Sequence, residues 1–169
     1  VLDVSQGNPT TTIGGGDGSV GELYVSNGLA NFHVLNVAQI GRGYVEVGAA
    51  TVTVASSLVI PVTHVTAGGT GVFAMVSADS YVVATNNMYL GADQASEAVR
   101  KASASLLVSN GTLRAGFAEI GRYGNGYMYI GAATVTVERN GNTGVYLSAG
   151  RAAPIDKGTG ILLIAHSGA

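Results

Sequence analysis

The stretch that decides the fold reads VGAATVTV at positions 47–54, and it returns almost letter for letter as IGAATVTV at positions 130–137. A shorter stretch, VSNG at positions 25–28, returns as VSNG at positions 108–111, with the same separation between its copies. Self-similarity at a fixed separation indicates a repeat architecture. We therefore predict that the chain is one repeat domain, residues 1–169, with related halves at positions 1–80 and 81–169.

Both repeated stretches have the pattern of short β-strands. Positions 51–54 alternate threonine and valine, and such alternation of β-branched residues is typical of a half-buried strand. A motif of apolar, any, apolar, then serine or glycine begins at positions 2, 23, 45, 74, 88, 106, 128 and 145. Its mean spacing of about 20 residues is typical of units that bury an apolar face only by stacking on one another.

Glycine and asparagine mark the turns between these strands, because both tolerate positive φ better than other residues do. The predicted structural turns are Asn27, Gly28, Gly41, Asn110, Gly111 and Gly121. Gly41 and Gly121 each stand between an isoleucine and an arginine. We take these two corners, with Arg42 and Arg122, as equivalent.

One stretch departs from the strand pattern. Positions 92–102, ADQASEAVRKA, have a helical composition, and Glu97 precedes Lys101 by one helical turn. That spacing gives a favourable ion pair on a helix surface. We predict a short helical insert near positions 92–104.

An all-β fold follows from these features. Short strands with glycine at the corners predict a β-solenoid (β-helix) of about eight irregular rungs in two related halves. The alternative is a duplicated β-sandwich or jelly roll, in which each half is a set of antiparallel strands. The uneven motif spacing favours this alternative, because the start at position 74 lies far from the one at 45 and close to the one at 88.

Composition excludes several classes of protein. Charged residues make up 11% of this chain, whereas an average domain has roughly 25%. A formal charge of −2 provides no basic field for nucleic acid. The absence of cysteine excludes disulfides and thiolate metal sites. The longest apolar runs, such as positions 161–165, are far shorter than the ~20 residues of a membrane span.

The run LYVSNG at positions 23–28, followed by IGRG at positions 40–43 and YVEVGAATVTV at positions 44–54, resembles the glycine-rich repeats of bacterial autotransporter passengers (surface adhesins). It is also similar to the stems of phage tail spikes and fibres. The autotransporter repeats typically place a strand of the type L-x-V-x-x-G before one of the type I-G-x-x-x-G. The resemblance implies a long, rigid, extracellular structure, frequently trimeric in the phage case.

Two carboxylates occupy the central position of the strand motif, Asp3 and Glu46, with Tyr24 between them in the series. Rungs stacked at the strand spacing of ~4.8 Å would place them about 10 Å apart. This is the long end of the separation in inverting glycosidases. Charges on strands more commonly discourage edge pairing.

The remaining titratable residues form no catalytic pattern. No two of the histidines have a metal-ligand spacing; they are His33, His64 and His166. We predict no catalytic residue, no metal site and no cofactor.

Four tyrosines share the central position of the motif: Tyr24, Tyr89, Tyr129 and Tyr146. If that position points outward, the four rings align on one face and can contact a ligand or partner, since tyrosine offers an apolar face with a polar tip. The other interpretation is that tyrosine is simply a good strand residue that packs at a subunit contact. The low charge of the chain favours this second interpretation.

Together, the residues and the resemblance predict a non-enzymatic structural or attachment component on the exterior of a phage virion, as a decoration, fibre or spike protein. The alternatives are a bacterial cell-surface adhesin similar to an autotransporter passenger, a polysaccharide depolymerase, and a glycan-binding module. The expected location is extracellular, at the virion surface or alternatively at the bacterial cell surface. Expected partners are further copies of the chain as a homo-oligomer (a trimer), other virion or cell-surface proteins, and surface glycan, but no nucleic acid.

Overall fold

A computed structural model of the chain describes residues 1–61, 68–91, 102–121, 123–138, 145–147 and 158–165. The regular structure of these residues is all β, as predicted from the sequence. In chain order the strands are β1 (Leu2–Val4), β2 (Thr10–Ile13), β3 (Val20–Val37), β4 (Arg42–Ile60), β5 (Thr70–Met75), β6 (Tyr81–Leu90), β7 (Ser103–Ile120), β8 (Asn125–Val137), β9 (Val145–Leu147) and β10 (Thr159–Ile164). In this described part, nothing helical is long and apolar enough to cross a membrane.

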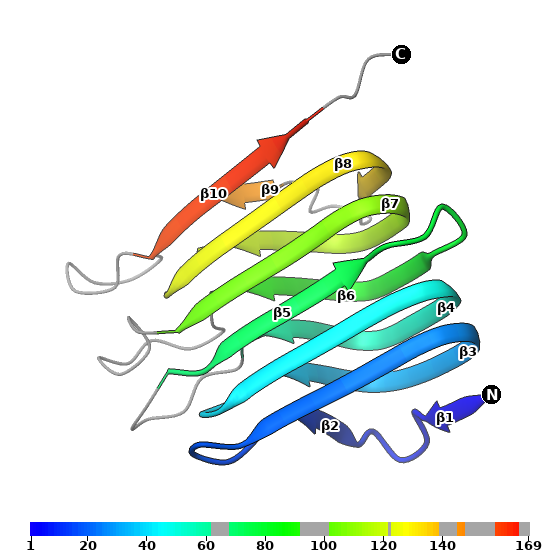
Figure 1. The fold of residues 1–169 in the computed structure, drawn as a ribbon, viewed down its shortest axis with the longest axis horizontal. Helices are drawn as coiled ribbons and strands as arrows, with labels where there is room; N and C mark the ends of the chain where they lie inside the picture. Colours follow the sequence, from blue (N-terminus) through cyan, green and yellow to red (C-terminus); the bar gives the residue numbers. More distant parts are fainter. Residues whose placement is uncertain (62–67, 92–101, 122, 139–144, 148–157, 166–169) are drawn as a thin grey trace.

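The chain winds through two layers, one in front of the other in Figure 1. The long strands β3, β4, β7 and β8 each bend from the front layer into the back layer, and β5 is followed by β6 in the same way. We call these parts front and back arms, and a front arm with the back arm that follows it a rung. The front arms are residues 20–25, 42–47, β5, 103–108, 125–130 and β10; the back arms are β1 with β2, residues 29–37, 51–60, β6, 112–120, and 134–137 with β9.

All strand pairs formed by the described residues are parallel. Front arms pair with front arms and back arms with back arms, so that Leu23 pairs with Val45 and Val45 with Phe73. Parallel neighbours require a long crossover of the chain, and here the other arm of the rung is that crossover. The predicted alternative, an antiparallel sandwich or jelly roll, is therefore wrong.

A single large apolar core lies between the two layers. Its side chains form columns in which each residue stacks on the corresponding residue of the next rung. One column of the front arms contains Leu23, Val45, Phe73, Leu106, Met128 and Leu162. In the middle rungs this column is buried, and it belongs to one continuous cluster with side chains of the back arms. Stacking therefore supplies a core that no single rung has.

The layers approach closely at the corner where the chain passes from a back arm to the next front arm. A Cβ on Gly43 would overlap the backbone nitrogen of Ala38, and one on Gly71 the carbonyl oxygen of Val37. This close approach of two backbones favours glycine, and Ala104 is the exception in its column. Glycine recurs there in one inward column: Gly21, Gly43, Gly71, Gly126 and Gly160.

The repeated stretches lie at the bends between the arms. Asn27 and Gly28 of β3 pair with Ala49 and Ala50 of β4. In the second copy, residues 110 and 111 of β7 pair in the same way with residues 132 and 133 of β8. The duplicated unit is thus a pair of neighbouring rungs, and the rung of β5 and β6 lies between the two copies.

The predicted count of about eight rungs is wrong, because the motif occurs in both layers. The motif that begins at position 74 starts in β5, and the motif that begins at position 88 starts in β6; these strands are the front and back arms of one rung. Those at positions 128 and 145 lie in the same relation, in β8 and β9. The short spacings thus separate arms, whereas the longer spacing from position 23 to position 45 separates successive rungs.

The helical insert predicted near positions 92–104 falls largely on residues 92–101, which lie outside the described residues. Its last two residues, Ser103 and Ala104, begin β7 and pair with Thr70 and Gly71. For these two residues the prediction is wrong, because pairing with β5 holds them in an extended conformation.

Candidate functional site

The four tyrosines of the motif do not share one face. Tyr24 and Tyr129 stand in one outward column of the front arms. Tyr89 and Tyr146 stand in a column of the back arms, on either side of Glu119. The predicted row is wrong because the period-2 pattern distinguishes inward from outward positions but not the front layer from the back layer.

The front layer instead brings together two tyrosines and two glutamates from β3 and β4. Glu22 pairs with Tyr44 and Tyr24 pairs with Glu46, so the four side chains form a square with like residues on its diagonals. The ring centroids of Tyr24 and Tyr44 lie 5.7 Å apart, with the rings tilted by 52°. We call these four residues the Tyr–Glu square.

Hydrogen bonds within each strand fix the Tyr–Glu square. The Tyr44 hydroxyl donates to Glu46 Oε2 at 2.6 Å, and the Tyr24 hydroxyl donates to Glu22 Oε2 at 3.1 Å. The hydrogen bond to Glu46, followed by burial, raises the pKa of Tyr44 to about 12. The hydrogen bond to Glu22 likewise raises the pKa of Tyr24. The phenols therefore stay neutral donors at ordinary pH, and each presents a ring beside a carboxylate.

The back layer carries a second aromatic group, formed by Tyr89, Phe117 and Tyr146. The ring centroids of Tyr89 and Phe117 lie 6.5 Å apart, and those of Phe117 and Tyr146 lie 5.3 Å apart. Glu119 stands in the column between the two tyrosines and is buried. Sequence reasoning missed Phe117 because it is outside the motif that singled out the tyrosines.

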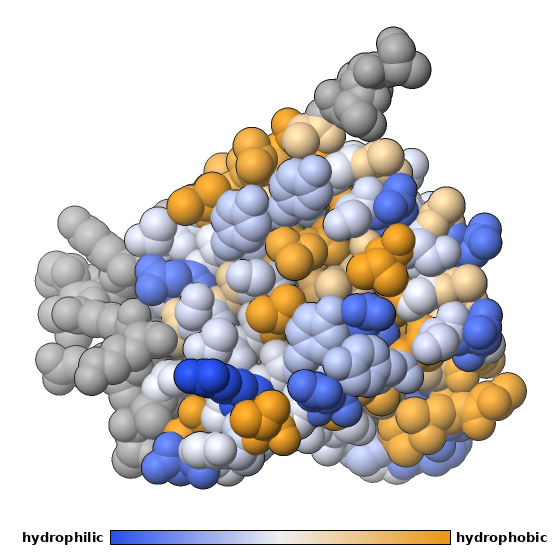
Figure 2. Space-filling model, in the orientation of Figure 1, coloured by the Kyte–Doolittle hydropathy of each residue, from blue (hydrophilic) through white to orange (hydrophobic). Residues whose placement is uncertain are grey.

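Exposed apolar side chains gather at the end of the stack that β10 forms. Figure 2 shows them along β10, at the upper edge of the molecule. Ile161, Leu163 and Ile164 of this strand are all exposed. In the sequence these positions are only an apolar run, because their exposure depends on the place of β10 at the edge of the sheet.

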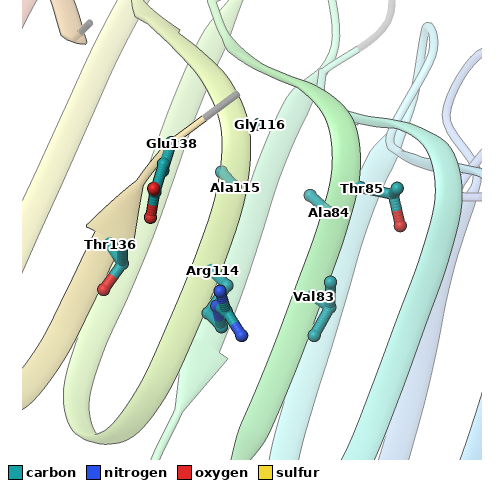
Figure 3. A pocket seen from close by; sticks show the side chains of 8 residues that line it. All are labelled: Val83, Ala84, Thr85, Arg114, Ala115, Gly116, Thr136 and Glu138. Carbon is teal, nitrogen blue, oxygen red and sulfur yellow. The ribbon is translucent and has the colours of Figure 1, made fainter. Parts of the chain in front are cut away.

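A shallow groove of about 160 Å³ crosses three back arms, and Figure 3 shows the side chains that line it. Arg114 projects from β7, Thr136 belongs to β8, and Glu138 directly follows β8. Residues 83–85 of β6 line the opposite side. The groove has one charge of each sign, so it concentrates neither anions nor cations.

The carboxylate pair considered from the sequence is not formed. Asp3 lies on β1 in the back layer, opposite Asn31, whereas Glu46 lies on the front arm of β4. Asp3 has a local partner: the Ser5 hydroxyl donates to its Oδ1 at 2.7 Å and the Ser5 backbone N–H at 3.1 Å, which lowers the pKa of Asp3. The structure places Glu22 near Glu46 instead, on one diagonal of the Tyr–Glu square.

The corners at Gly41 and Gly121 are not equivalent. The N–H of Gly121 donates to the carbonyl of Leu90, as that of Ala38 donates to the carbonyl of Ile13. Gly121, with φ of 75°, is thus the counterpart of Ala38, with φ of 71°. These two residues have the same separation as the two VSNG stretches, so the repeat continues through the corner with its separation unchanged.

The pairing of the front arms agrees with the match of Ala38 with Gly121. Arg42 stands in the same column as Asn125, so the predicted match of Arg42 with Arg122 is wrong. Arg122 itself lies outside the described residues.

At the bends, Gly28 and Gly111 both have φ of 88°, and the side-chain amide of Asn110 donates to the carbonyl of Val76 at 3.5 Å.

Of the three histidines, His33 is among the described residues, at the register shift between Phe32 and Val34. His64 and His166 lie outside them. Within the described part of the chain, no three histidine, aspartate or glutamate side chains come together in a way that could hold a metal ion.

Comparison of the chain with protein families, with curated proteins and with solved structures finds no match. The fold and the surface of this chain are therefore the only basis for inferring its function.

Proposed function

We propose that the chain is a β-solenoid that serves as a non-enzymatic structural or attachment component on the exterior of a phage virion, as a decoration, fibre or spike protein. The observation that carries this proposal is the unbroken series of parallel pairs around one continuous core. Each rung adds about 4.8 Å to the stack. Hydrogen bonds between rungs run along the stack, so it resists extension and bending as an exposed stem must.

Polar groups at one bend support this role. The hydroxyl of Ser80, a buried residue, donates to the carbonyls of Val47 and Gly48 at 2.9 and 2.7 Å. The N–H of Thr112 in turn donates to the carbonyl of Ser80. Three successive rungs are therefore tied together at a bend that has neither a VSNG nor a GAATVTV stretch.

Immunogold labelling tests the location, with antibodies raised against the chain and applied separately to purified particles and to cells of the source. Label on the particle exterior supports the virion component. Label confined to the cell surface supports the alternative, a bacterial adhesin with an autotransporter-like passenger. Label found only inside cells contradicts both.

We propose the Tyr–Glu square as the surface that attaches to glycan. Tyrosine offers an apolar face with a polar tip, and carboxylates are strong acceptors of hydrogen bonds such as those from sugar hydroxyls. Tyr24 is 55% exposed and open to such contact.

A glycan array probed with the wild type and with Tyr24→Ala tests this attachment. Binding that is lost in the variant supports it, and no binding by either protein contradicts it. Tyr81→Ala, on the back layer, is the matched control.

A polysaccharide depolymerase is the second candidate, because of the diagonal between Glu22 and Glu46. Strands about 4.8 Å apart and a rise of about 3.3 Å per residue place their Cα atoms about 8 Å apart. The carboxyl groups of inverting glycosidases are about 6.5–9.5 Å apart, a separation that two glutamate side chains on such Cα atoms can reach. Reducing-sugar release from capsular polysaccharide that disappears in Glu22→Gln and in Glu46→Gln would establish the enzyme. No release by the wild type supports the non-enzymatic role.

A further inference from the structure

The two ends of the stack have complementary shapes. At the lower end in Figure 1, β1 and β2 form a back arm, and among the described residues the front arm of β3 has no strand beneath it. At the upper end, β10 is a front arm stacked on β8, and the described residues form no back arm that continues from it. In the described part of the chain, one end is thus a back half-rung and the other a front half-rung, so together they make one rung.

We propose that a second copy of this chain docks on these ends head to tail, so that β10 of one copy pairs with the front arm of β3 of the next. In the same contact, β1 stacks on the back arm of β8 and β2 stacks on β9. This inference rests on the rung arrangement of the proposed solenoid and is independent of its location on a virion.

The inward columns of the front arms continue across this contact without a shift of register. Ile164 ends the column that begins at Val25, and Leu162 ends the column that begins at Leu23. Val25 is 8% exposed, whereas Ile164, at the open end of the same column, is 66% exposed. Docking places Ile164 on Val25 and Leu162 on Leu23 of the next copy, which covers Ile164, Leu162 and Leu23 and the small part of Val25 that is still exposed.

The back arms match in the same way. Leu147 ends a column that begins at Ile13, and Val135 ends a column that begins at Leu2. Leu147 and Leu2 are both exposed. Apolar residues therefore meet apolar residues in both layers, and the gain scales with the area that they remove from water.

Charges do not oppose the contact. In the continued register, Glu22 of one copy faces Ile161 of the other, and Asp3 faces Thr136. No like charges lie directly opposite each other among the described residues of these strands, which is the arrangement that would destabilise a pair. The exposed edges also present backbone N–H and C=O groups that a further strand can satisfy.

A head-to-tail contact uses two different surfaces, so it repeats without closing and gives an open stack. The predicted trimer, with copies side by side, does not pair β10 of one copy with β3 of another. The two assemblies are therefore distinguished by which residues meet. Tyr24 and Leu163 become neighbours only in the head-to-tail contact, because within one copy they are separated by five strand spacings, or about 24 Å.

Disulfide trapping tests the contact, since the chain has no cysteine of its own. The double variant Tyr24→Cys with Leu163→Cys places thiols on exposed positions that face each other across the contact. Neighbouring strands are about 4.8 Å apart, within the Cα separation of about 4.4–6.8 Å that a disulfide spans. Mild oxidation should give a ladder of dimer, trimer and longer species on a non-reducing gel, and reduction should remove it.

The matched control is Tyr24→Cys with Ile161→Cys, in which the second thiol is out of register with the first. Its Cα atoms would be about 8 Å apart, too far for a disulfide, so the ladder should be lost. Equal ladders from both double variants, or none from either, would overturn the proposal. So would sedimentation of the wild type as a monomer, or as a closed trimer, at every concentration tested.

A second variant acts on the free edge itself. The N–H of Arg42 donates down to the carbonyl of Ser19. Backbone N–H groups point to the same side of a strand at every second residue, so the N–H of Tyr44 has the same direction as that of Arg42. Glu22 pairs with Tyr44, and its N–H therefore has this direction too. It points to the free edge of β3. Docking would pair this N–H with β10 of the next copy.

Proline at position 22 removes that donor, and edge strands tolerate proline. Glu22→Pro should therefore lower the average mass of the assembly with the strand circular dichroism unchanged. Glu22→Thr, which keeps the N–H, should leave the mass as in the wild type. An unchanged mass in Glu22→Pro contradicts the contact.

Discussion

The two copies of the repeated unit, β3 with β4 and β7 with β8, have nearly the same sequence at their bends but different surroundings. Gly28 and Gly111 have the same φ of 88°. A Cβ on Gly28 would meet nothing within 4 Å, whereas one on Gly111 would overlap the carbonyl oxygen of Ser80. The difference arises because the rung of β5 and β6 lies under the second copy, whereas in the described part only β1 and β2 lie under the first.

The same contrast holds in the core. Val52 and Val54 of the first copy are fully buried, whereas their counterparts Val135 and Val137 are only partly buried. The residues are identical, so their burial is set by the rungs above and below them. In a stack of this kind, the energetic weight of a residue follows its place along the stack more than its type.

The largest effect that tests this comparison is the loss of a core leucine. Leu23 and Leu106 are counterparts in one column, but Leu106 is fully buried and Leu23 only packs against the edge of the core. Leu106→Ala should reduce the free energy of unfolding by about 2–5 kcal/mol. Leu23→Ala should cost less than half as much, as measured by chemical denaturation of dilute monomer.

Equal losses from the two leucine variants would mean that Leu23 is covered, and would contradict the comparison. Raising the protein concentration provides a further check. If head-to-tail docking buries Leu23, the cost of Leu23→Ala should increase with concentration, and that of Leu106→Ala should not.

The repeat in the sequence predicted much of this arrangement. Alternating threonine and valine at positions 51–54 indicated a strand, and the structure has them in β4 with valine inward. Glycine at positions 28 and 111 indicated positive φ, which both residues have, although they lie inside the continuous strands β3 and β7 and not between strands. These predictions succeed because they depend on local conformation, which the residue type restricts directly.

Predictions that depended on which layer a strand belongs to were wrong. Tyr24 and Tyr89 occupy the same place in the motif, yet one lies in the front layer and the other in the back layer. Only the bends decide the layer, and the bend between β5 and β6 has no repeated stretch. The Tyr–Glu square was missed for the same reason, since Tyr44 and Glu22 meet through the pairing of β3 with β4.

The bend glycines give the second largest effect. Alanine at positive φ costs about 1–2 kcal/mol, so Gly28→Ala should lose about that much stability. Gly111→Ala should lose about 1–3 kcal/mol more, because its Cβ must displace the backbone of Ser80. Thermal and chemical denaturation of the two variants measure the difference. Equal destabilisation would show that the second bend relaxes freely and would break the comparison.

The corner offers a smaller, stabilising change. Ala38 has φ of 71°. Glycine occupies the corresponding corners, as Gly121 in the second copy and as Gly91 after β6, and both glycines have positive φ. Ala38→Gly relieves a left-handed strain of about 1–2 kcal/mol and costs some backbone entropy, so we expect about 0.5–1 kcal/mol of added stability. The reciprocal change, Gly121→Ala, should destabilise, because its Cβ would overlap the backbone of Thr159. A lower denaturation midpoint for Ala38→Gly would contradict the assignment of these corners.

A last contrast lies between Tyr44 and its counterpart Tyr127, because Glu46 of the first copy corresponds to Tyr129 of the second. The hydrogen bond to Glu46 raises the pKa of Tyr44 from its ordinary value of 10.0 to about 12. A raised pKa means that the folded state favours the neutral phenol. The resulting stabilisation is therefore complete below pH 10 and is lost as the pH rises through about 12.

Replacing the acceptor tests this assignment. Glu46→Gln should move the Tyr44 ring resonances to a lower titration midpoint in NMR, and it should reduce the loss of stability in that alkaline window. Glu22→Gln removes the first partner of Tyr24 instead, so it should move the Tyr44 midpoint less. Equal shifts from the two variants would show that the Tyr–Glu square titrates as one unit, because each carboxylate would then act on both phenols alike.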